Sequence, residues 1–370
     1  MAQHVIPRYR GFNLLDLFST SNRWDEHFPM SHGHFAESDF QWMSEWGFDF
    51  ARIPMSYLYF VNNEERDSFN EKQLSYLDEV IRLGEKYGIH ICLSFHRAAG
   101  YCITEYPFDL RERGNLWKDK EDLELFKLHW SILAKRYKGI GSDRLSFDLI
   151  NEPPVIIDKD SKGNDPYTTV TWEDYVKVHK GTAETIHGID PERLIIIDGG
   201  DIGNSPCLEM ANMKNIAQSC RGYSPSLLTH YRCPWNKPNR NSALDVRWPW
   251  RPEYAPSETG IISDSEVQEY LETWDDERFR EMYRPWFDLA DKGTGVHMGE
   301  CGCYRSTPHK AVLSWFESLL SLMKEHNIGF ALWNFRGSFG ILDSGRKDVA
   351  YEDWNGHLLD RELLDILRKY

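Results

Sequence analysis

Short apolar segments of strand length alternate with helical patterns along almost the whole chain of 370 residues. This alternation is typical of βαβ units, in which helices connect parallel strands. Eight segments fit strands: 11–15, 48–54, 90–96, 145–151, 193–199, 226–231, 295–300 and 329–335. They predict an α/β fold, a single (β/α)8 TIM barrel with elaborated strand-to-helix loops that occupies residues 1–370 as one domain.

Between these segments, apolar residues recur at the three- and four-residue spacing of amphipathic helices. The clearest stripes are Leu74, Leu77 and Val80, then Leu123, Phe126, Trp130 and Leu133, then Val312, Trp315, Leu319 and Leu322, and a closing stripe of Leu359, Leu363 and Ile366. A helix near 207–217, after the fifth strand, has the weakest pattern. An open, doubly wound sheet is the weaker alternative, since no Gly-x-Gly-x-x-Gly motif follows a strand.

The charge balance restricts the kinds of partner that this chain binds. Its formal net charge is −15, and its pI is near 5.4. An acidic chain without a basic run is not expected to bind nucleic acid or an anionic membrane. The 14 Trp and 18 Tyr side chains offer flat faces that suit a neutral ligand such as a sugar, although core packing is expected for about half of them.

Cysteine usage and the amino-terminal sequence favour a cytoplasmic protein. Seven cysteines, an odd number, are scattered along the chain, which favours reduced thiols over a complete disulfide framework. Residues 1–10 lack the apolar core of a signal peptide, and no apolar run approaches the roughly 18 residues of a spanning helix. Secretion stays open if a signal peptide has been removed.

Two of the eight predicted strands end in a glutamate. Residues 145–154 read Leu-Ser-Phe-Asp-Leu-Ile-Asn-Glu-Pro-Pro, an apolar run that brings Asn151 and Glu152 to its carboxyl end before two prolines stop it. Residues 295–300, Gly-Val-His-Met-Gly-Glu, end in Glu300 in the same way. Barrels keep their active sites at this rim, so the two carboxylates are expected to face each other.

A pair of facing carboxylates suits the cleavage of a glycosidic bond. Retaining hydrolysis needs one carboxylic acid to protonate the leaving oxygen and, roughly 5 to 5.5 Å away, a carboxylate to attack the anomeric carbon. The acid requires a raised pKa and the nucleophile must stay ionised. Arg52, at the end of the second predicted strand, and Tyr231, at the end of the sixth, are expected neighbours of the nucleophile.

Six motifs in chain order resemble those of glycoside hydrolase family 5, the cellulase-like retaining hydrolases. They are Ala51-Arg52-Ile53-Pro54, Ser94-Phe95-His96-Arg97, Asn151-Glu152-Pro153, His230-Tyr231, Gly299-Glu300 and Leu332-Trp333-Asn334-Phe335. The resemblance implies that Glu152 is the acid/base and Glu300 the nucleophile. It further implies that Arg52 and Tyr231 hold the nucleophile, Asn151 binds the sugar 2-hydroxyl, His96 and His230 line the reacting subsite, and Trp333 stacks beneath the sugar.

Each of these residues also has a purely structural interpretation. His96 and His230 fit satisfied core histidines, Trp333 fits barrel packing, and Asn151 fits a cap before the prolines. The pairs Cys301-Gly302-Cys303 and His32-Gly33-His34 lack a second pair at zinc-site spacing, so we assign no metal and no cofactor.

Long predicted loops carry further aromatic residues. Loop 16–34 contains Trp24 and Phe28, loop 97–120 contains Tyr101, Tyr106 and Trp117, and loop 232–266 contains Trp235, Trp248 and Trp250. Loop 232–266 is expected to form a wall over the sugar site. Asp343 and Arg346, after the last strand, fit an internal ion pair better than a closed end of the substrate pocket.

The resemblance implies a β-glucan or gluco-oligosaccharide as the substrate. An exo-acting β-glycosidase and a mannan- or xylan-type hydrolase stay open as alternatives, as does a carbohydrate-binding barrel without catalysis. The sequence leaves the sugar, the linkage, endo or exo action and the oligomeric state undecided.

Overall fold

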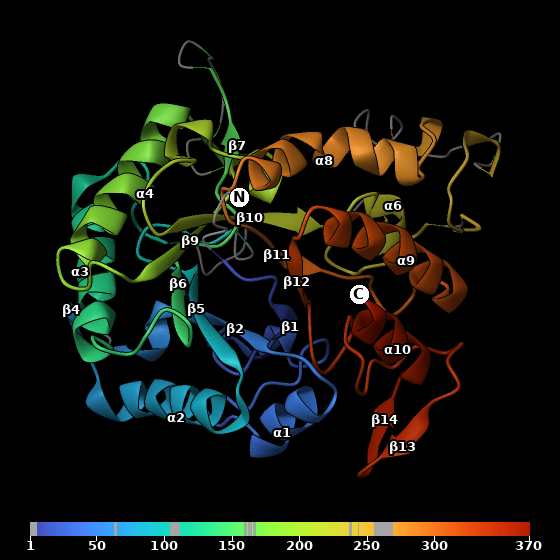
Figure 1. Ribbon diagram of the computed structural model, residues 1–370, viewed down its shortest axis with the longest axis horizontal. Helices are drawn as coiled ribbons and strands as arrows, with labels where there is room; N and C mark the ends of the chain where they lie inside the picture. Colours follow the sequence, from blue (N-terminus) through green and yellow to red (C-terminus); the bar gives the residue numbers. More distant parts are fainter. Residues whose placement is uncertain are drawn as a thin grey trace.

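Eight strands close into one parallel barrel in the computed structural model of the chain (Figure 1). The structure describes residues 6–62, 65–103, 112–158, 161, 165, 168–236, 239–242, 244–254 and 269–370. Around the barrel the order is β1 (Arg10–Asn13), β12 (Gly329–Leu332), β11 (Val296–Cys301), β10 (Ile216–Gly222), β9 (Leu194–Asp198), β6 (Leu145–Asp148), β5 (His90–Arg97) and β2 (Phe50–Ser56). The predicted (β/α)8 barrel is therefore confirmed.

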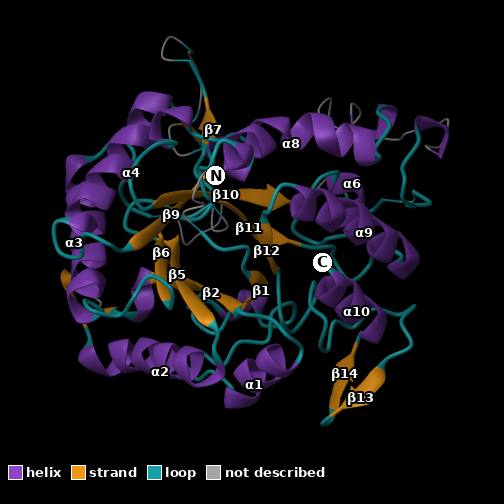
Figure 2. Cartoon of the chain, in the orientation of Figure 1, coloured by secondary structure: helices purple, strands orange, loops and turns teal. Residues whose placement is uncertain are grey.

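Helices surround the barrel, as Figure 2 shows by the purple helices around the orange strands. The long ones are α1 (Glu37–Glu45), α2 (Glu71–Tyr87), α3 (Lys120–Arg136), α4 (Trp172–His187), α8 (Asp276–Asp291), α9 (His309–Glu325) and α10 (Arg361–Lys369). The stripes of apolar residues read from the sequence fall on α2, α3, α9 and α10, except that Leu359 of the closing stripe ends strand β14 (His357–Leu359), and most of these side chains are buried.

Small two-stranded sheets elaborate the loops. They are β3 (Val61–Asn62) with β4 (Glu65–Phe69), β7 (Val155–Ile156) with β8 (Thr169–Val170), and β13 (Glu352–Trp354) with β14 (His357–Leu359). In Figure 1 the β13–β14 hairpin projects beside α10. Helices in the described part of the chain lack the combination of length and apolar composition that a bilayer span needs.

The sixth strand lies elsewhere than the sequence predicts. Residues 216–222 form β10, whereas the predicted strand 226–231 contains the single-turn helix α6 (Ser226–Thr229). β10 reads Ile-Ala-Gln-Ser-Cys-Arg-Gly, and its polar side chains are buried, so it lacks the apolar run by which the other strands were recognised. Pro225 precedes the apolar residues 226–231 and begins a helical turn instead.

The helix predicted near 207–217 is also wrong. After β9 the described chain has only the single turn α5 (Gly200–Gly203) and the 3-10 turn η3 (Leu208–Met210) before β10 begins at Ile216. The crossover from β9 to β10 is therefore made with short turns, which brings the segment after β9 close to the barrel rim.

Two layers of side chains fill the barrel. The lower layer is apolar and includes Phe50, Cys92, Leu194, Ile196 and Ala331 from four different strands. The layer above it, towards the carboxyl ends of the strands, is polar and almost fully buried. All seven cysteines, each of which the structure describes, are buried and unpaired, as the reduced-thiol interpretation expects.

Candidate active site

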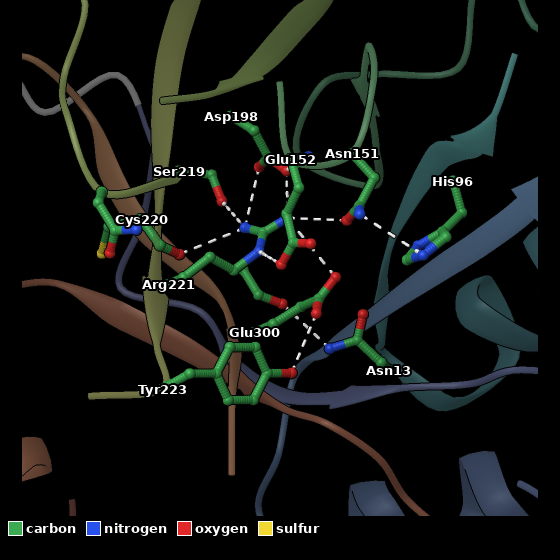
Figure 3. Close-up of polar contacts among 12 residues, drawn as sticks. Asn13, His96, Asn151, Glu152, Asp198, Ser219, Cys220, Arg221, Tyr223 and Glu300 are labelled. Atoms are coloured by element: carbon green, nitrogen blue, oxygen red, sulfur yellow. Dashed lines mark hydrogen bonds and ion pairs between the residues drawn. The ribbon is translucent and has the colours of Figure 1, made fainter. Parts of the chain in front are cut away.

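Polar and charged side chains from seven barrel strands meet at the carboxyl rim, and Figure 3 shows part of this cluster. They lie on or directly after strands that are far apart in the chain, and each is buried or nearly so. The set consists of Asn13, Arg52, Ser94, Asp148, Asn151, Glu152, Asp198, Ser219, Arg221 and Glu300. Buried charges are costly unless they are paired, so this cluster is organised by its hydrogen bonds.

Arg52 on β2 uses its whole guanidinium to hold the cluster together. Its Nη1 donates to Glu300 Oε1 over 2.6 Å, and its Nε donates to Asp148 Oδ2 over 2.7 Å. The remaining donors reach three neutral acceptors, which are Asn13, Ser94 and Asn151. Because all the nitrogens of the Arg52 guanidinium donate hydrogen bonds, Arg52 fixes the position of one oxygen of Glu300.

Arg221 on β10 links the two glutamates. Its Nε donates to Glu152 Oε1 over 3.1 Å, and its Nη2 lies 3.5 Å from Glu300 Oε1. Both Nη groups also donate to Asp198, which anchors the guanidinium from below. The two carboxyl groups therefore lie at one guanidinium, although they are separated by 148 positions in the sequence.

Asn151 is oriented by both arginines. Its Oδ1 accepts from Arg52 Nη2 over 3.0 Å and from Arg221 Nη2 over 2.9 Å. The amide Nδ2 consequently faces the other way and lies 3.5 Å from His96 Nε2. This orientation leaves the amide nitrogen as a donor on the side of the histidine.

The backbone turns sharply at Glu152. This residue has a φ of 45°, in the left-handed region that non-glycine residues rarely adopt. Its N–H donates to Asp198 Oδ2 over 2.8 Å, and its carbonyl accepts from the Tyr101 hydroxyl over 2.6 Å. These two bonds hold the turn and direct the side chain to Arg221.

A β-bulge aims Glu300. In the pairing of β10 with β11, Cys220 lies opposite Met298 but Arg221 lies opposite Glu300, so Gly299 is the extra residue. A Cβ at Gly299 would come within 2.5 Å of Ser219 Oγ and 3.0 Å of Arg221 Nη1. Only glycine fits here, and the Glu300 Oε2 atom is then free to accept from the Tyr223 hydroxyl over 3.0 Å.

The two glutamates occupy different electrostatic environments. Burial, followed by the charge of Glu300, raises the pKa of Glu152 to about 8, against the opposing effect of Arg221. Burial and Asp198 likewise raise the pKa of Asp148 to about 6. Glu300, by contrast, accepts hydrogen bonds from Arg52 and Tyr223. At neutral pH Glu152 therefore keeps its proton.

A cavity of about 410 Å³ opens above these groups. Both glutamates line it, together with three residues that the sequence predicts there, His96, His230 and Trp333. Trp333 stacks on His96 with ring centroids 5.7 Å apart. Burial lowers the pKa of His230 to about 4 and that of His96 well below its usual value, so both rings are neutral at neutral pH.

The structure corrects the expectation that Tyr231 holds the nucleophile. The Tyr231 hydroxyl donates to the carbonyl of Leu244 over 2.9 Å, and Tyr223 contacts Glu300 in its place. The error follows from the misplaced sixth strand, because β10 ends at Gly222 and Tyr223 is the first residue after it.

Asp343 and Arg346 do not form the predicted ion pair with each other, and neither residue lines the cavity that holds the two glutamates. Asp343 accepts from His357 Nδ1 over 2.7 Å. The buried Arg346 donates to backbone carbonyls of Cys303, Tyr304 and Thr307. Arg346 therefore holds the loop after β11 in shape.

Sequence reasoning missed Asp198, Arg221 and Tyr223. Asp198 ends the apolar run Leu-Ile-Ile-Ile-Asp of β9, which is the same signal that singled out Glu152. No comparable signal marks Arg221 or Tyr223, since β10 is not an apolar run.

The aromatic loops contribute to the site unevenly. Trp24, Phe28 and Trp235 line the cavity. Trp248 instead donates to Ser318 Oγ over 2.8 Å, and Trp250 is fully buried. Loop 232–266 therefore forms a wall of the site through Trp235, as far as its described residues show, while Tyr106 and residues 255–266 lie outside the described part of the chain.

In the described part of the chain, no group of three or more His, Cys, Asp or Glu side chains is arranged to hold a metal ion.

Residues 10–338 match the family described as cellulase, glycosyl hydrolase family 5. The chain belongs to glycoside hydrolase family 5. This family 5 glycoside hydrolase is 26% identical over 327 residues to Endoglucanase C of Acetivibrio thermocellus, with 85% of this chain and 88% of the relative covered. It is 25% identical over 296 residues to Cellodextrinase A of Ruminococcus flavefaciens, with 79% and 76% covered.

A solved structure described as a glycoside hydrolase resembles this family 5 enzyme over nearly its full length. The two chains are 36% identical, the match covers 98% of this chain and 99% of the other, and the TM-score is 0.81. The protein is accordingly a hydrolase of O-glycosyl bonds with a TIM barrel fold, as the motifs in its sequence indicate.

Proposed function

We propose that this family 5 enzyme hydrolyses β-linked gluco-oligosaccharides with retention of configuration, with Glu152 as the acid/base and Glu300 as the nucleophile. The observation that carries the proposal is that two carboxyl groups meet at the guanidinium of Arg221, while burial and Glu300 raise the pKa of Glu152. A shared guanidinium fits the short separation, roughly 5 to 5.5 Å, of a retaining pair better than the wider gap of an inverting pair.

In the first step, a Glu300 oxygen attacks the anomeric carbon while Glu152 gives its proton to the leaving oxygen. The glycosidic bond breaks, and an ester forms between Glu300 and the sugar. The raised pKa of Glu152 supports this role, because the acid must carry its proton at neutral pH. The Tyr223 and Arg52 hydrogen bonds orient Glu300 for attack.

In the second step, Glu152 takes a proton from a water molecule, which attacks the same carbon and frees Glu300. Ester formation removes the negative charge of Glu300, which is the second-largest cause of the raised pKa of Glu152. The pKa of Glu152 therefore falls when it has to act as a base. The Arg221 Nε–H, 3.1 Å from Glu152 Oε1, stabilises the carboxylate that results.

The cavity supports a sugar as the ligand. It is lined by aromatic faces and a few polar groups, among them His96 and His230, as expected for a small-molecule site. We assign Trp333 to stacking beneath the reacting sugar and the Asn151 amide to its 2-hydroxyl. The names of the relatives, an endoglucanase and a cellodextrinase, favour glucose as that sugar.

The proposal is tested by following hydrolysis of a nitrophenyl β-glycoside panel and of cello-oligosaccharides by proton NMR in the first minutes. We expect the highest rates on β-glucosyl substrates, and a first product with the β configuration. A first product with the α configuration would mean that water, and not Glu300, attacks the sugar. Highest rates on mannosyl or xylosyl substrates would redirect the substrate assignment.

A further inference from the structure

Aromatic side chains from three loops close one end of the cavity. Trp24 and Phe28 follow β1, Trp235 follows β10, and Phe339 follows β12. Trp235 is central, since its ring centroid lies 5.3 Å from Trp24, 5.7 Å from Phe28 and 6.3 Å from Phe339. We call these four residues the aromatic wall.

The aromatic wall is tightly packed. Trp24, Phe28 and Phe339 are 2 to 5% exposed although all three line the cavity. Behind them Tyr304 packs against Trp235 with centroids 5.4 Å apart. The loops are also joined through their backbones, because the N–H of Ser338 donates to the carbonyl of His27 over 2.9 Å. The wall is therefore held by ring packing and by a backbone hydrogen bond between two of its loops.

The end of the cavity beside Glu152 has a more exposed lining than Trp24, Phe28 and Phe339, in the part of the chain that the structure describes. Ile103 and Ile202 are half-buried there and Asn204 is exposed. Ile202 donates its N–H to the carbonyl of Pro153 over 2.9 Å, so this end lies directly beside Glu152.

The order of the strands gives the two ends opposite relations to the catalytic pair. The nucleophile strand β11 lies between β10 and β12, whose loops carry Trp235 and Phe339. The acid/base follows β6, which lies between β9 and β5, and their loops carry Ile202, Asn204 and Ile103. The wall therefore flanks Glu300 and the more exposed end flanks Glu152.

The chemistry of the reaction sets the direction of the substrate. The leaving oxygen must lie beside the acid Glu152, so the released part of the substrate extends to the more exposed end. The sugar that becomes bonded to Glu300 lies on the side of Trp333, whose ring is 5.8 Å from Phe28 of the wall. Any further sugar at the non-reducing end of that residue would meet the aromatic wall.

We infer that this enzyme is exo-acting: the cavity accepts one terminal sugar at the non-reducing end, and each turnover releases that single residue. The inference rests on the proposed function, since it uses the roles assigned to Glu152 and Glu300. It adds a substrate class, free non-reducing ends of β-linked gluco-oligosaccharides, in contrast to internal bonds of a polymer.

Cellopentaose labelled at its reducing end distinguishes the two modes of action. We expect glucose and the labelled tetrasaccharide as the first products, followed by the labelled trisaccharide only as the tetrasaccharide is consumed. Labelled di- or trisaccharide among the first products would overturn the inference while the proposed function stood. Absence of hydrolysis on every β-glucosyl substrate would overturn the proposed function and the inference with it.

A blocked substrate gives an independent readout. Nitrophenyl β-cellotrioside and the same compound with a 4,6-ketal on its terminal glucose differ only at the non-reducing end. We expect release of nitrophenol from the first, after successive removal of glucose, and none from the second. Equal rates on both compounds would contradict the aromatic wall as a barrier.

Replacing the central residue of the wall tests its role directly. Trp235 is only half-buried, so Trp235→Ala is expected to fold and to open space beyond the terminal sugar. This variant should release labelled trisaccharide from cellopentaose early. Trp248→Ala is the matched control, because Trp248 lies in the same loop but bonds to Ser318 away from the cavity. An unchanged product order in folded Trp235→Ala would contradict the proposed barrier.

Discussion

Arg221 donates from Nε to Glu152 over 3.1 Å, so the proposed acid of the reaction is paired with a buried cation. That pairing opposes the larger effects of burial and of Glu300, which together raise the pKa of Glu152. The balance among these three influences sets the pH at which the enzyme can protonate a leaving group, and it can be tested by substitution.

In the pH profile of the enzyme, activity is expected to fall at high pH as Glu152 loses its proton. We call this decline the basic limb of the profile. Since the pKa of Glu152 is about 8, kcat/KM for an unactivated glucoside should decline with a midpoint near pH 8. Glu152→Gln should lose this basic limb when it is assayed with a dinitrophenyl glucoside, which leaves without protonation. A basic limb that persists in Glu152→Gln would assign the titration to another group.

Arg221→Gln should shift the basic limb to higher pH. Removing the guanidinium removes the influence that lowers the pKa of Glu152, so the acid keeps its proton further into the basic range. The change also removes the guanidinium that donates two hydrogen bonds to the buried Asp198, at a cost to stability of about 3 to 5 kcal/mol. Arg221→Lys, which keeps the charge, is the control. A limb that does not move in Arg221→Gln, with the fold verified by circular dichroism, would show that Arg221 does not act on Glu152.

Tyr223 and Tyr231 form a matched pair of variants. Tyr223→Phe removes a hydrogen bond to Glu300, and the loss of a bond to a charged group, about 1.5 to 3 kcal/mol, corresponds to a roughly 10- to 100-fold lower kcat/KM. Tyr231→Phe removes a bond to the Leu244 carbonyl and should leave kcat within about twofold of the native value. A larger loss of activity in Tyr231→Phe than in Tyr223→Phe would show that Tyr231, and not Tyr223, holds the nucleophile.

Gly299→Ala is expected to reduce both stability and activity. The added Cβ would lie 2.5 Å from Ser219 Oγ, so Ser219 and Arg221 must shift, and overpacking of this kind costs about 1 to 3 kcal/mol. Gly188→Ala offers a control, since a Cβ there meets its neighbours at 3.4 Å or more. Thermal unfolding and kcat of the two variants check the expectation. A Gly299→Ala enzyme as stable and active as Gly188→Ala would show that the bulge is not needed.

Much of the fold is predictable because seven of the eight barrel strands coincide with strand-like segments of the sequence and four helices with apolar stripes. A parallel strand buried on both faces must be apolar, and this requirement makes it visible in the sequence. β10 is the exception because Ser219 and Arg221 point into the polar layer of the barrel, while Gln218 faces outward and bonds to the backbone of Cys207. A strand that carries part of the site therefore loses the signal by which strands are recognised.

The same physical reason explains which parts of the site were found. Glu152 and Glu300 stand out as charged residues at the ends of apolar runs, and Arg52 lies within one. Tyr223 follows a polar strand, so the nearest tyrosine after an apolar run, Tyr231, was chosen in its place. The aromatic wall depends on three loops that meet only in the folded chain, and loop positions cannot be read from periodicity.

The assignment of Glu300 as the nucleophile is tested most directly by trapping the covalent intermediate. A 2-deoxy-2-fluoro glucoside with a good leaving group slows the second step, so the enzyme should gain the mass of one fluoroglucosyl group. After trypsin digestion the added mass should lie on residues 293–305, a peptide in which Glu300 is the sole acidic side chain. Addition instead to residues 145–159, which contain Glu152, or turnover without any adduct, would contradict the account.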